Sequence, residues 1–408
     1  MNEFPREAIS SCLGCKMARC EETCPIHNPI PQIIALLKEG KEEEAADLLH
    51  SSNPFPELTS SLCDFDRQCR GHCVRGIRAT SVDVPSIEKY LSRYPRPYRM
   101  ARIRKPKVAL VGAGIANLTI AYLLIQKGYS VDVFESLDQI GGAIYSGIPR
   151  FRFPLGPMKA IQEELRSAGV RFFFHKTIDQ DSLNVLRKDY SFVVLGVGAQ
   201  KENMAGLTPS LGIYGGLAFL REINLSIGEK REFHNPVIWG GGNVAMDCAR
   251  TALKEYGKAT VIYRRGKEEM PASRQEIEEA ILEGVEIRFL ENIVQTKTEN
   301  GKLEGVFLTK MEYGPLDSSA RRSVIEVPNS TSFFPCDLLI AALGEKPDLS
   351  SFGLKSLNPD DLRKGRIYLV GDARYGAKTI ASAIANGKEI AKQIEEDETN
   401  STPVLSSF

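Results

Sequence analysis

Seven of the nine cysteines in this 408-residue chain lie between positions 12 and 73. They form two runs, Cys12-x2-Cys15-x4-Cys20-x3-Cys24-Pro25 and Cys63-x5-Cys69-x3-Cys73. Thiolates a few residues apart on a loop can wrap one iron–sulfur cluster, and a cysteine before proline often serves a second cluster. The four-residue gap in the first run differs from the short bacterial ferredoxin motif. The spacing therefore predicts iron–sulfur clusters in a domain other than a plain ferredoxin.

Seven thiolates do not complete two four-iron clusters, which need eight ligands. Either one cluster is incomplete, or the eighth ligand is not a cysteine. The alternative is structural zinc, with one four-cysteine site and three spare thiols. We favour clusters, because zinc sites rarely leave cysteines over in this way. Cys248 and Cys336 stand alone and are expected to be buried small hydrophobic residues.

The overall composition excludes several other classes of protein. Lys plus Arg and Asp plus Glu both number 52, so no basic excess indicates nucleic-acid binding. The odd number and close grouping of the cysteines argue against a disulfide framework. The opening MNEFPREAISSC lacks the pattern of a signal peptide, and glycines interrupt the longest apolar stretch, 108–125. We expect a cytoplasmic protein without a membrane span.

Residues 1–95 are predicted to form a small α-helical domain around the cysteines. Ile30 to Leu49 has the apolar spacing of two short amphipathic helices broken at Gly40, and Pro85 to Tyr94 suggests another helix. The proline-rich stretch 95–106 is predicted to be a linker.

A nucleotide-binding turn follows the linker. Lys107 to Val111 is a buried-strand pattern, and a second strand ends at Glu135. Between them lies the sequence Gly112-Ala113-Gly114-Ile115-Ala116-Asn117, which opens a helix. The first two glycines allow a tight turn and let the backbone approach a pyrophosphate, and the acidic residue would accept hydrogen bonds from ribose hydroxyls. Asn117 replaces the usual third glycine, and we expect it to loosen the packing of helix on strand.

A second such turn begins after the strand Pro236 to Trp239, with the sequence Gly240-Gly241-Gly242-Asn243-Val244-Ala245. The next strand ends at Arg264 and Arg265, without an acidic residue. Arginines suit the 2′-phosphate of NADP, whereas a carboxylate would select NAD. The alternative is a solvated basic strand end.

A third element lies near the C-terminus. A short strand, 367–370, leads into Gly371 and Asp372, and a helix is predicted from about Thr379 to Ile394. Asp372 suits a hydrogen bond to the ribityl chain of a flavin, and equally the role of helix N-cap.

These motifs together resemble the small subunit of bacterial glutamate synthase and its relatives, over about residues 12–394. Those relatives include the large subunit of NADH-dependent ferredoxin–NADP oxidoreductase and the N-terminal half of dihydropyrimidine dehydrogenase. The resemblance rests on the cysteine pattern, GAGIAN, GGAIYSGIPRFRFP, GGGNVAMDCARTAL, YRRGKEEMPASRQEIEEA, AALGEKPD and GDARYGAKTIASAIANGK.

The resemblance implies two [4Fe–4S] clusters with separate ligand sets. The first ligand set is Cys12, Cys15, Cys20 and Cys73. The second ligand set is Cys24, Cys63, Cys69 and, as the eighth ligand, Glu88. The alternative for Glu88 is an ordinary carboxylate on a helix surface.

The resemblance also implies FAD in the first nucleotide-binding domain, held by Ala113, Gly114, Ile115, Ala116, Asn117, Glu135, Gly142, Arg152, Asp372 and Thr379. It implies NADPH, with NADH as the alternative, at Gly240, Gly241, Gly242, Asn243, Val244, Arg264 and Arg265. Leu155 stands where most relatives have lysine, and Ala377 where most have proline.

The predicted fold is α/β: the helical cluster domain (1–95), a discontinuous FAD domain (104–200 and 336–395), and an NAD(P)H domain (201–335) inserted in it. We predict hydride transfer between NADPH and FAD, then single electrons through two [4Fe–4S] clusters to or from a partner subunit. No catalytic acid is expected, and the five histidines show no ligand or triad spacing. The alternative function is an electron wire or scaffold, within a bifurcating, hydrogenase or formate dehydrogenase complex, whose nucleotide site is not catalytic.

Overall fold

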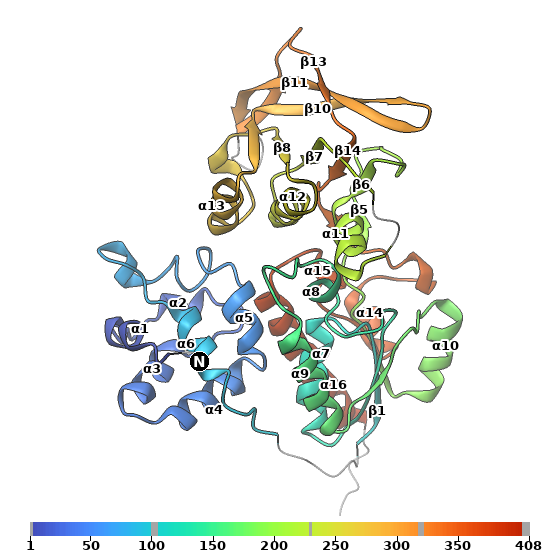
Figure 1. Cartoon of the computed structure of the whole chain (residues 1–408). Helices are drawn as coiled ribbons and strands as arrows, with labels where there is room; N and C mark the ends of the chain where they lie inside the picture. Colours follow the sequence, from blue (N-terminus) through green and yellow to red (C-terminus); the bar gives the residue numbers. More distant parts are fainter. Residues whose placement is uncertain (1–2, 99–104, 228–230, 317–321, 402–408) are drawn as a thin grey trace, which may run out of the picture. The chain divides into compact units, whose positions relative to one another are not determined.

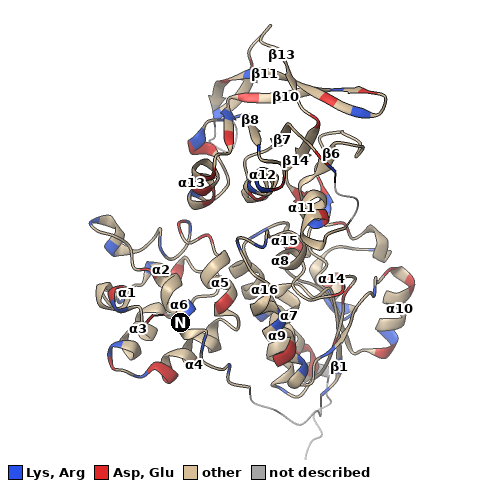
Figure 2. Cartoon of the chain, in the orientation of Figure 1, with Lys and Arg blue, Asp and Glu red and all other residues tan. Residues whose placement is uncertain are grey.

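The computed structural model describes residues 3–98, 105–227, 231–316 and 322–401. The chain divides into two compact units (Figure 1). The first unit contains Met1–Tyr145, Arg152–Ala199 and Pro347–Phe408, and the second contains Ser146–Phe151 and Gln200–Lys346. The predicted linker 95–106 is described only in part, because 99–104 lie outside the described residues. In both units, acidic and basic side chains are interspersed along the helices and strands (Figure 2).

The N-terminal part of the first unit is helical, as predicted. Its elements are α1 (Arg6–Ser11), α2 (Arg19–Glu22), α3 (Ile30–Lys38), α4 (Glu42–Ser52), α5 (Pro56–Leu62), the 3-10 turn η1 (Val74–Ile77) and α6 (Val84–Leu91). Gly40 has φ +75° and breaks the helical stretch between α3 and α4, where the sequence predicted a break. The apolar faces of α3, α4 and α6 share one core, and Cys69 lies in that core with three other cysteines packed against it. The cysteine-bearing loops are thus built onto the helical core.

A five-stranded parallel sheet forms the rest of the first unit, in the order β16-β4-β1-β2-β3. Its strands are β1 (Lys107–Val111), β2 (Ser130–Phe134), β3 (Arg171–Phe173), β4 (Phe192–Leu195) and β16 (Ile367–Leu369). Its helices are α7 (Ile115–Ile125), α8 (Ala143–Ser146), α9 (Gly156–Ser167), α10 (Gln180–Asp189), α14 (Pro359–Lys364), α15 (Asp372–Tyr375) and α16 (Ile380–Ser401). Helix α7 is almost wholly buried and packs along α16.

The second unit has its own parallel sheet, in the order β6-β14-β7-β8-β9. These strands are β6 (Ile213–Gly215), β7 (Pro236–Trp239), β8 (Thr260–Tyr263), β9 (Glu286–Phe289) and β14 (Leu338–Ala341). The packed helices are α11 (Gly216–Leu225), α12 (Asn243–Tyr256) and α13 (Arg274–Glu283). Two parallel sheets in one chain confirm the predicted α/β class.

The second unit also differs from the prediction in its boundary. We expected the FAD domain to resume at 336, but β14 pairs in parallel with both β6 and β7. The strand therefore completes the second sheet, and the boundary at 335 is too early. The segment Ser146–Phe151 also belongs to this unit, because the Asn224 amide donates to the carbonyl oxygens of Ser146 and Ile148 at 3.0 and 3.2 Å.

An antiparallel sheet in the second unit was not predicted. It contains β10 (Glu291–Glu299), β11 (Lys302–Leu316), β12 (Arg322–Glu326) and β13 (Ser332–Pro335), with β11 pairing the other three. A two-stranded ribbon joins β5 (Lys201–Glu202) and β15 (Glu345–Lys346). The short 3-10 turns η2 (Lys267–Glu269) and η3 (Ser350–Phe352) complete the elements. Among the described residues, no helix combines the length and apolar character needed to cross a membrane.

Gly387 tests the packing of α16 on α7. A Cβ at this position would lie 2.6 Å from the Ala116 carbonyl oxygen and 2.8 Å from the Thr119 Cβ. We expect Gly387→Ala to lower the free energy of unfolding by about 1–3 kcal/mol, as overpacking of a buried interface does. Thermal and denaturant unfolding of the full chain measures this loss.

The matched control is Gly156→Ala at the start of α9, where an added Cβ meets nothing within 4 Å. This control should leave the unfolding midpoint unchanged or slightly raised. Equal behaviour of the two variants would contradict the close α7–α16 contact.

Candidate cofactor-binding sites

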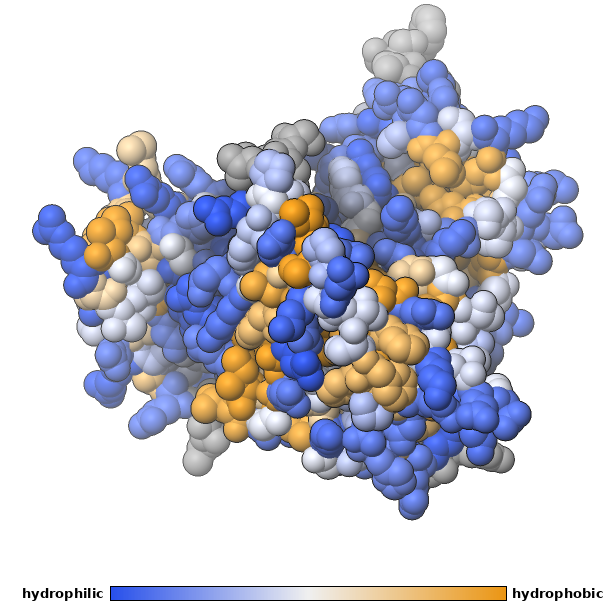
Figure 3. Space-filling model, turned by 90° about the horizontal axis from the view of Figure 1, so that it is seen from above, coloured by the Kyte–Doolittle hydropathy of each residue, from blue (hydrophilic) through white to orange (hydrophobic). Residues whose placement is uncertain are grey.

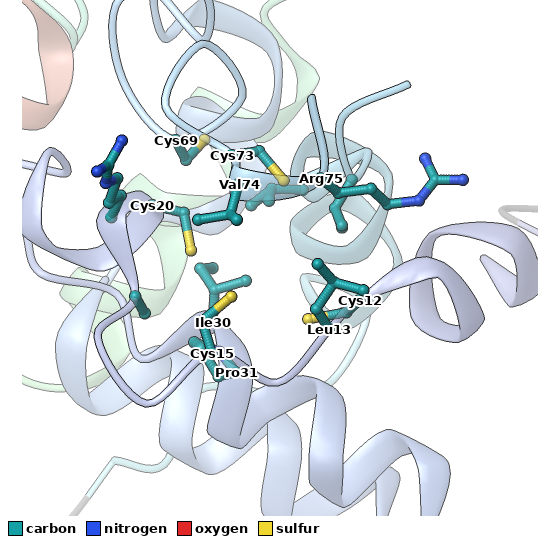
Figure 4. Close-up of a pocket in the computed structure, with 14 residues that line it drawn as sticks. Cys12, Leu13, Cys15, Cys20, Ile30, Pro31, Cys69, Cys73, Val74 and Arg75 are labelled. Carbon is teal, nitrogen blue, oxygen red and sulfur yellow. The ribbon is translucent and has the colours of Figure 1, made fainter. Parts of the chain in front are cut away.

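The first ligand set surrounds one hollow in the helical domain (Figure 4). Cys12 ends α1, Cys20 lies in α2, and Cys73 precedes η1. Figure 4 shows the sulfur atoms of these residues and of Cys15 turned toward the same space. Ile30, Pro31, Val74, Val82 and Val84 supply apolar walls. The structure thus brings together the four cysteines that the resemblance grouped, and Cys69 of the second ligand set lines the same hollow.

The electrostatics of this hollow favour a bound cation. Burial raises the pKa of Cys20 to about 11, and the neighbouring Cys73 and Cys12 add to the shift. Thiolates held this close repel one another unless positive charge lies among them. In the described part of the chain, no three His, Cys, Asp or Glu side chains approach closely enough to bind a single metal ion. The donor set suits iron in a multi-atom cluster, whose thiolate ligands stand around a larger group.

The second ligand set is more deeply buried than the first. Cys24, Cys69 and Glu88 are buried and Cys63 is partly exposed, whereas all four cysteines of the first ligand set are partly exposed. Burial raises the pKa of the Cys63 thiol, and negative charge on Glu88, Cys69 and Cys24 raises it further. Glu88 likewise raises the pKa of Cys69 and of Cys24. These mutual effects require the four side chains to lie close together.

Glu88 is not a surface carboxylate. Its exposed fraction is 5%, although it belongs to a short amphipathic helix, α6. Asn28 Nδ2 donates to Oε1 at 2.7 Å, and Thr59 Oγ1 donates to Oε2 at 2.8 Å. Burial raises the pKa of Glu88 to about 7, while these two hydrogen bonds hold it down. The alternative of a helix-surface residue is therefore wrong. The carboxylate is positioned, and its remaining lone pairs are available to a metal.

Glu135 organises the first nucleotide-binding turn. Its Oε2 accepts from the Ala113 N–H at 2.7 Å, and its Oε1 accepts from the Leu137 N–H at 2.8 Å. Gly112 has φ +92°, and a Cβ there would lie 2.6 Å from the Gly196 carbonyl oxygen. Gly142 has φ +52°, and a Cβ at this position would lie 3.2 Å from the Gly114 Cα. The predicted residues Ala113, Gly114, Glu135 and Gly142 thus lie together at the N-terminus of α7. Hydrogen bonds from Glu135 to a ribose stay a prediction.

Asn117 corrects the expectation of loose packing. Its side chain is fully buried, and Nδ2 donates to the carbonyl oxygens of Val111 and Gly112 at 2.9 and 2.8 Å. The amide fills space against Gly196, where a Cβ would lie 2.6 Å from Nδ2. Asn117 therefore ties α7 to the end of β1 and is a structural residue. Its Oδ1 is buried without a hydrogen-bond partner among the described residues, and a contact of Asn117 with FAD stays a prediction.

The C-terminal motif joins the same unit. Burial raises the pKa of Asp372 to about 6, and its carboxylate accepts from the Lys378 N–H at 3.1 Å. Thr379, rather than Asp372, caps α16, because its Oγ1 accepts from the Ser382 N–H at 3.2 Å. The N-cap interpretation of Asp372 is therefore wrong. Arg152 is half-buried and follows directly after the segment that belongs to the second unit.

Gln68 was missed by the sequence analysis. It is buried next to Cys69, and its Nε2 donates to Thr379 Oγ1 at 3.3 Å. A polar residue beside a ligand cysteine was the available signal, but the 311-residue separation hid its partner. The contact connects the second ligand set to the C-terminal flavin motif within the first unit.

The second nucleotide-binding turn depends on close backbone contacts. Gly240 has φ +142°, and its Cβ would lie 2.2 Å from the Ala342 carbonyl oxygen. A Cβ on Gly241 would lie 2.6 Å from the Tyr263 ring. Gly242 precedes α12, whose first residues are Asn243 and Val244, and Asn243 Oδ1 accepts from the Ser273 N–H at 2.8 Å.

Arg264 and Arg265 follow the end of β8, which pairs in parallel with β7. Parallel strands bring their carboxyl ends to one edge, so the two arginines and the N-terminus of α12 share that edge of the sheet. Arg264 is exposed and Arg265 is half-buried. Neither arginine has an ion pair within the part of the chain that the structure describes. The edge combines backbone N–H groups with two available cations.

Comparisons with known proteins agree with this architecture. A family model described as dihydropyrimidine dehydrogenase domain II, 4Fe-4S cluster, matches residues 2–99, and a model described as pyridine nucleotide-disulphide oxidoreductase matches residues 106–387. The glutamate synthase [NADPH] small chain of Escherichia coli K12 is 33% identical over 94% of this chain and 89% of that protein. The NADP(+)-dependent formate dehydrogenase subunit beta of Moorella thermoacetica is 31% identical over 93% of this chain, which spans 60% of that longer protein.

Among solved structures, FprA of Mycobacterium tuberculosis in complex with NADPH is similar in fold. The TM-score is 0.61 at 18% identity, covering 73% of this chain and 85% of that one.

Asn117→Ala tests the structural role of the buried amide. The variant loses two hydrogen bonds, each worth about 0.5–1.5 kcal/mol, so we expect a loss of about 1–3 kcal/mol in the free energy of unfolding. Denaturant unfolding of the full chain measures it. Asn184→Ala, an exposed asparagine in α10 of the same unit, is the control and should have no such effect. An undiminished stability of Asn117→Ala would return Asn117 to the role of a loose replacement for glycine.

Proposed function

Because the chain belongs to the family of the glutamate synthase small chain, and over 106–387 to the pyridine nucleotide-disulphide oxidoreductases, we propose that it passes electrons between NADPH and a partner subunit. It is an NADP(H)-dependent flavoprotein oxidoreductase with FAD and a 4Fe-4S domain. The proposal goes further in naming two clusters, their ligands and the order of transfer. The observation that carries it is the Gln68–Thr379 hydrogen bond, which links the flavin motif to the second ligand set.

Nicotinamide, flavin and iron–sulfur clusters have different roles in the proposed electron transfer. A nicotinamide gives two electrons as a hydride, iron–sulfur clusters carry electrons singly, and a flavin handles both. The chain's own residues would bind and orient these groups and exclude water. For FAD, these are the backbone of Ala113–Asn117 together with Glu135, Gly142, Arg152, Asp372 and Thr379. No side chain is assigned as acid or base.

The two ligand sets would hold two [4Fe–4S] clusters, and they differ in their surroundings. The second ligand set is buried and lies beside the flavin motif through Gln68. The first ligand set is partly exposed. Electron transfer weakens with distance, so the second ligand set suits the cluster nearer the flavin, and the first suits exchange with another protein.

The surface over the first ligand set supports that exchange. Leu13, Met17 and Ile77 are exposed to 63, 80 and 71%, and they lie within or next to the cysteine runs. Figure 3 shows that apolar residues are set among hydrophilic ones on the face that it displays. Lys16, Arg19 and Arg78 are exposed nearby. This surface suits a redox subunit with an apolar contact and acidic neighbours, of the kind found in glutamate synthase or formate dehydrogenase complexes.

The second unit would bind NADPH at the edge formed by the α12 N-terminus and the two arginines. Backbone N–H groups at a helix N-terminus suit the pyrophosphate, and guanidinium groups suit the 2′-phosphate. A cytoplasmic location is part of the proposal, because free, cluster-binding cysteines need a reducing environment.

Cys20→Ser and Glu88→Gln test the two ligand sets separately. Cys20→Ser should remove one cluster, because that cluster loses a thiolate ligand. The protein should then lose about half of its iron and one EPR signal, and FAD should stay bound. Glu88→Gln should alter only the other signal. Iron content, flavin absorbance and EPR of anaerobic preparations measure these effects. Cys336→Ala, in the second unit, is the control. If all iron survives in Cys20→Ser, the ligand assignment is wrong, and an unchanged EPR spectrum of Glu88→Gln removes Glu88 from it.

Arg264→Ala with Arg265→Ala tests the nucleotide preference. Loss of charge-assisted hydrogen bonds worth about 1.5–3 kcal/mol should raise the KM for NADPH by about tenfold to a hundredfold. The KM for NADH should change little, because NADH has no 2′-phosphate. Steady-state reduction of an artificial acceptor with each nucleotide measures both values. Lys258→Ala, before the opposite end of β8, is the matched control. Equal effects on both nucleotides would reject the 2′-phosphate role.

A further inference from the structure

Lys388 is a cation of the flavin-binding part that reaches into the helical domain. It lies in α16, one residue after Gly387, whose backbone packs against α7. Its Nζ donates to the Ser52 carbonyl oxygen at 2.8 Å, across 336 residues of sequence. Ser52 is the last residue of α4, so the ammonium group lies at the negative end of that helix dipole.

A short chain of hydrogen bonds leads from this contact to the second ligand set. Ser52 Oγ donates to Asn28 Oδ1 at 2.9 Å, and Asn28 Nδ2 donates to Glu88 Oε1 at 2.7 Å. The backbone of Asn28 also acts on Cys24, where it opposes the rise in pKa that burial causes. Asn28 is 2% exposed, so the path runs through the protein interior. Lys388 therefore lies in the same buried polar network as two members of the ligand set.

The charge of Lys388 acts directly on this set. Burial lowers the pKa of Lys388, and negative charge at Cys24 raises it. Acidic groups also act on these cysteines: Glu88 raises the pKa of Cys24, Cys63 and Cys69, and Asp64 raises that of Cys63. Lys388 thus adds positive charge beside a site on which these carboxylates place negative charge.

We propose that Lys388 is a redox-tuning residue that raises the reduction potential of the cluster bound by the second ligand set. Each one-electron reduction adds one negative charge to a cluster that already has anionic ligands. A nearby cation, here the partly buried Lys388, stabilises the reduced form more than the oxidised form. Lys388 would thereby favour transfer of an electron from the flavin to the cluster. The inference rests on the ligand set in the proposed function and adds the residue that sets its potential.

The test is a potentiometric titration of the anaerobic full chain, followed by EPR. Lys388→Met keeps the length of the side chain and removes its charge. We expect the equilibrium constant for reduction of one cluster to fall about tenfold, a shift of about 59 mV to lower potential for a one-electron couple. The other cluster and the flavin should change much less. Lys388→Arg should keep the wild-type value, and Lys388→Gln repeats the test if Lys388→Met loads less iron.

Lys392→Met is the matched control, since Lys392 lies one turn further along α16 with its side chain 80% exposed. A potential unchanged in Lys388→Met and Lys388→Gln, or shifted equally in Lys392→Met, overturns the proposal. The shifted signal should be the one that Glu88→Gln alters, and a shift confined to the other signal also overturns it. Failure of the proposed function is separate, because wild-type protein would then lack two cluster signals or their reduction by NADPH.

Discussion

Like charge held out of water is the constraint on which the first unit depends. Two buried thiols, the partly exposed thiol of Cys63 and a buried carboxyl make up the second ligand set, and negative charge on Glu88 makes ionisation of the three thiols harder. The first ligand set has the same property at Cys20. Burying anionic groups side by side is costly unless positive charge compensates them. The helical domain supplies apolar walls and a few donors, so these thiols ionise readily only where positive charge, such as that of iron, compensates them.

Helix α16 connects that domain to the flavin-binding sheet. Its first residues contact Gln68 through Thr379, its middle packs on α7 at Gly387, and Lys388 reaches Ser52. The helix and its capping Thr379 thus contact the nucleotide-binding turn, and also Gln68 and Ser52 of the helical domain. The three contact points, Thr379, Gly387 and Lys388, follow one another along α16 and its N-cap, beside the proposed electron path.

The sequence predicted the parts of this structure that local patterns determine. Apolar runs and glycines located β1, α7, β7 and α12, because a buried strand followed by a glycine turn has few other uses. The cysteine spacing and the family resemblance grouped both ligand sets.

The antiparallel sheet was not predicted because β10 and β12 are largely exposed and polar, so they lack a clear apolar alternation. The boundary at 335 was wrong because β14 returns to a sheet whose other strands all precede the antiparallel sheet in the chain. Lys388 and Gln68 find partners more than 300 residues away, which no local periodicity encodes. Asn117 was misjudged because its substitution for glycine gives no indication of the two carbonyl groups that it binds.

Anaerobic reduction of the isolated chain, followed optically and by EPR, tests directly whether electrons pass from NADPH through the flavin to two clusters. NADPH and NADH are added in separate titrations. We expect NADPH to bleach the flavin first, and signals from two [4Fe–4S] clusters to appear afterwards. NADH should reduce the flavin much less effectively. A flavin that stays oxidised with either nucleotide would contradict the account and favour an electron wire or scaffold with a non-catalytic nucleotide site. Reduction by NADH alone would overturn the assignment of the two arginines to the 2′-phosphate.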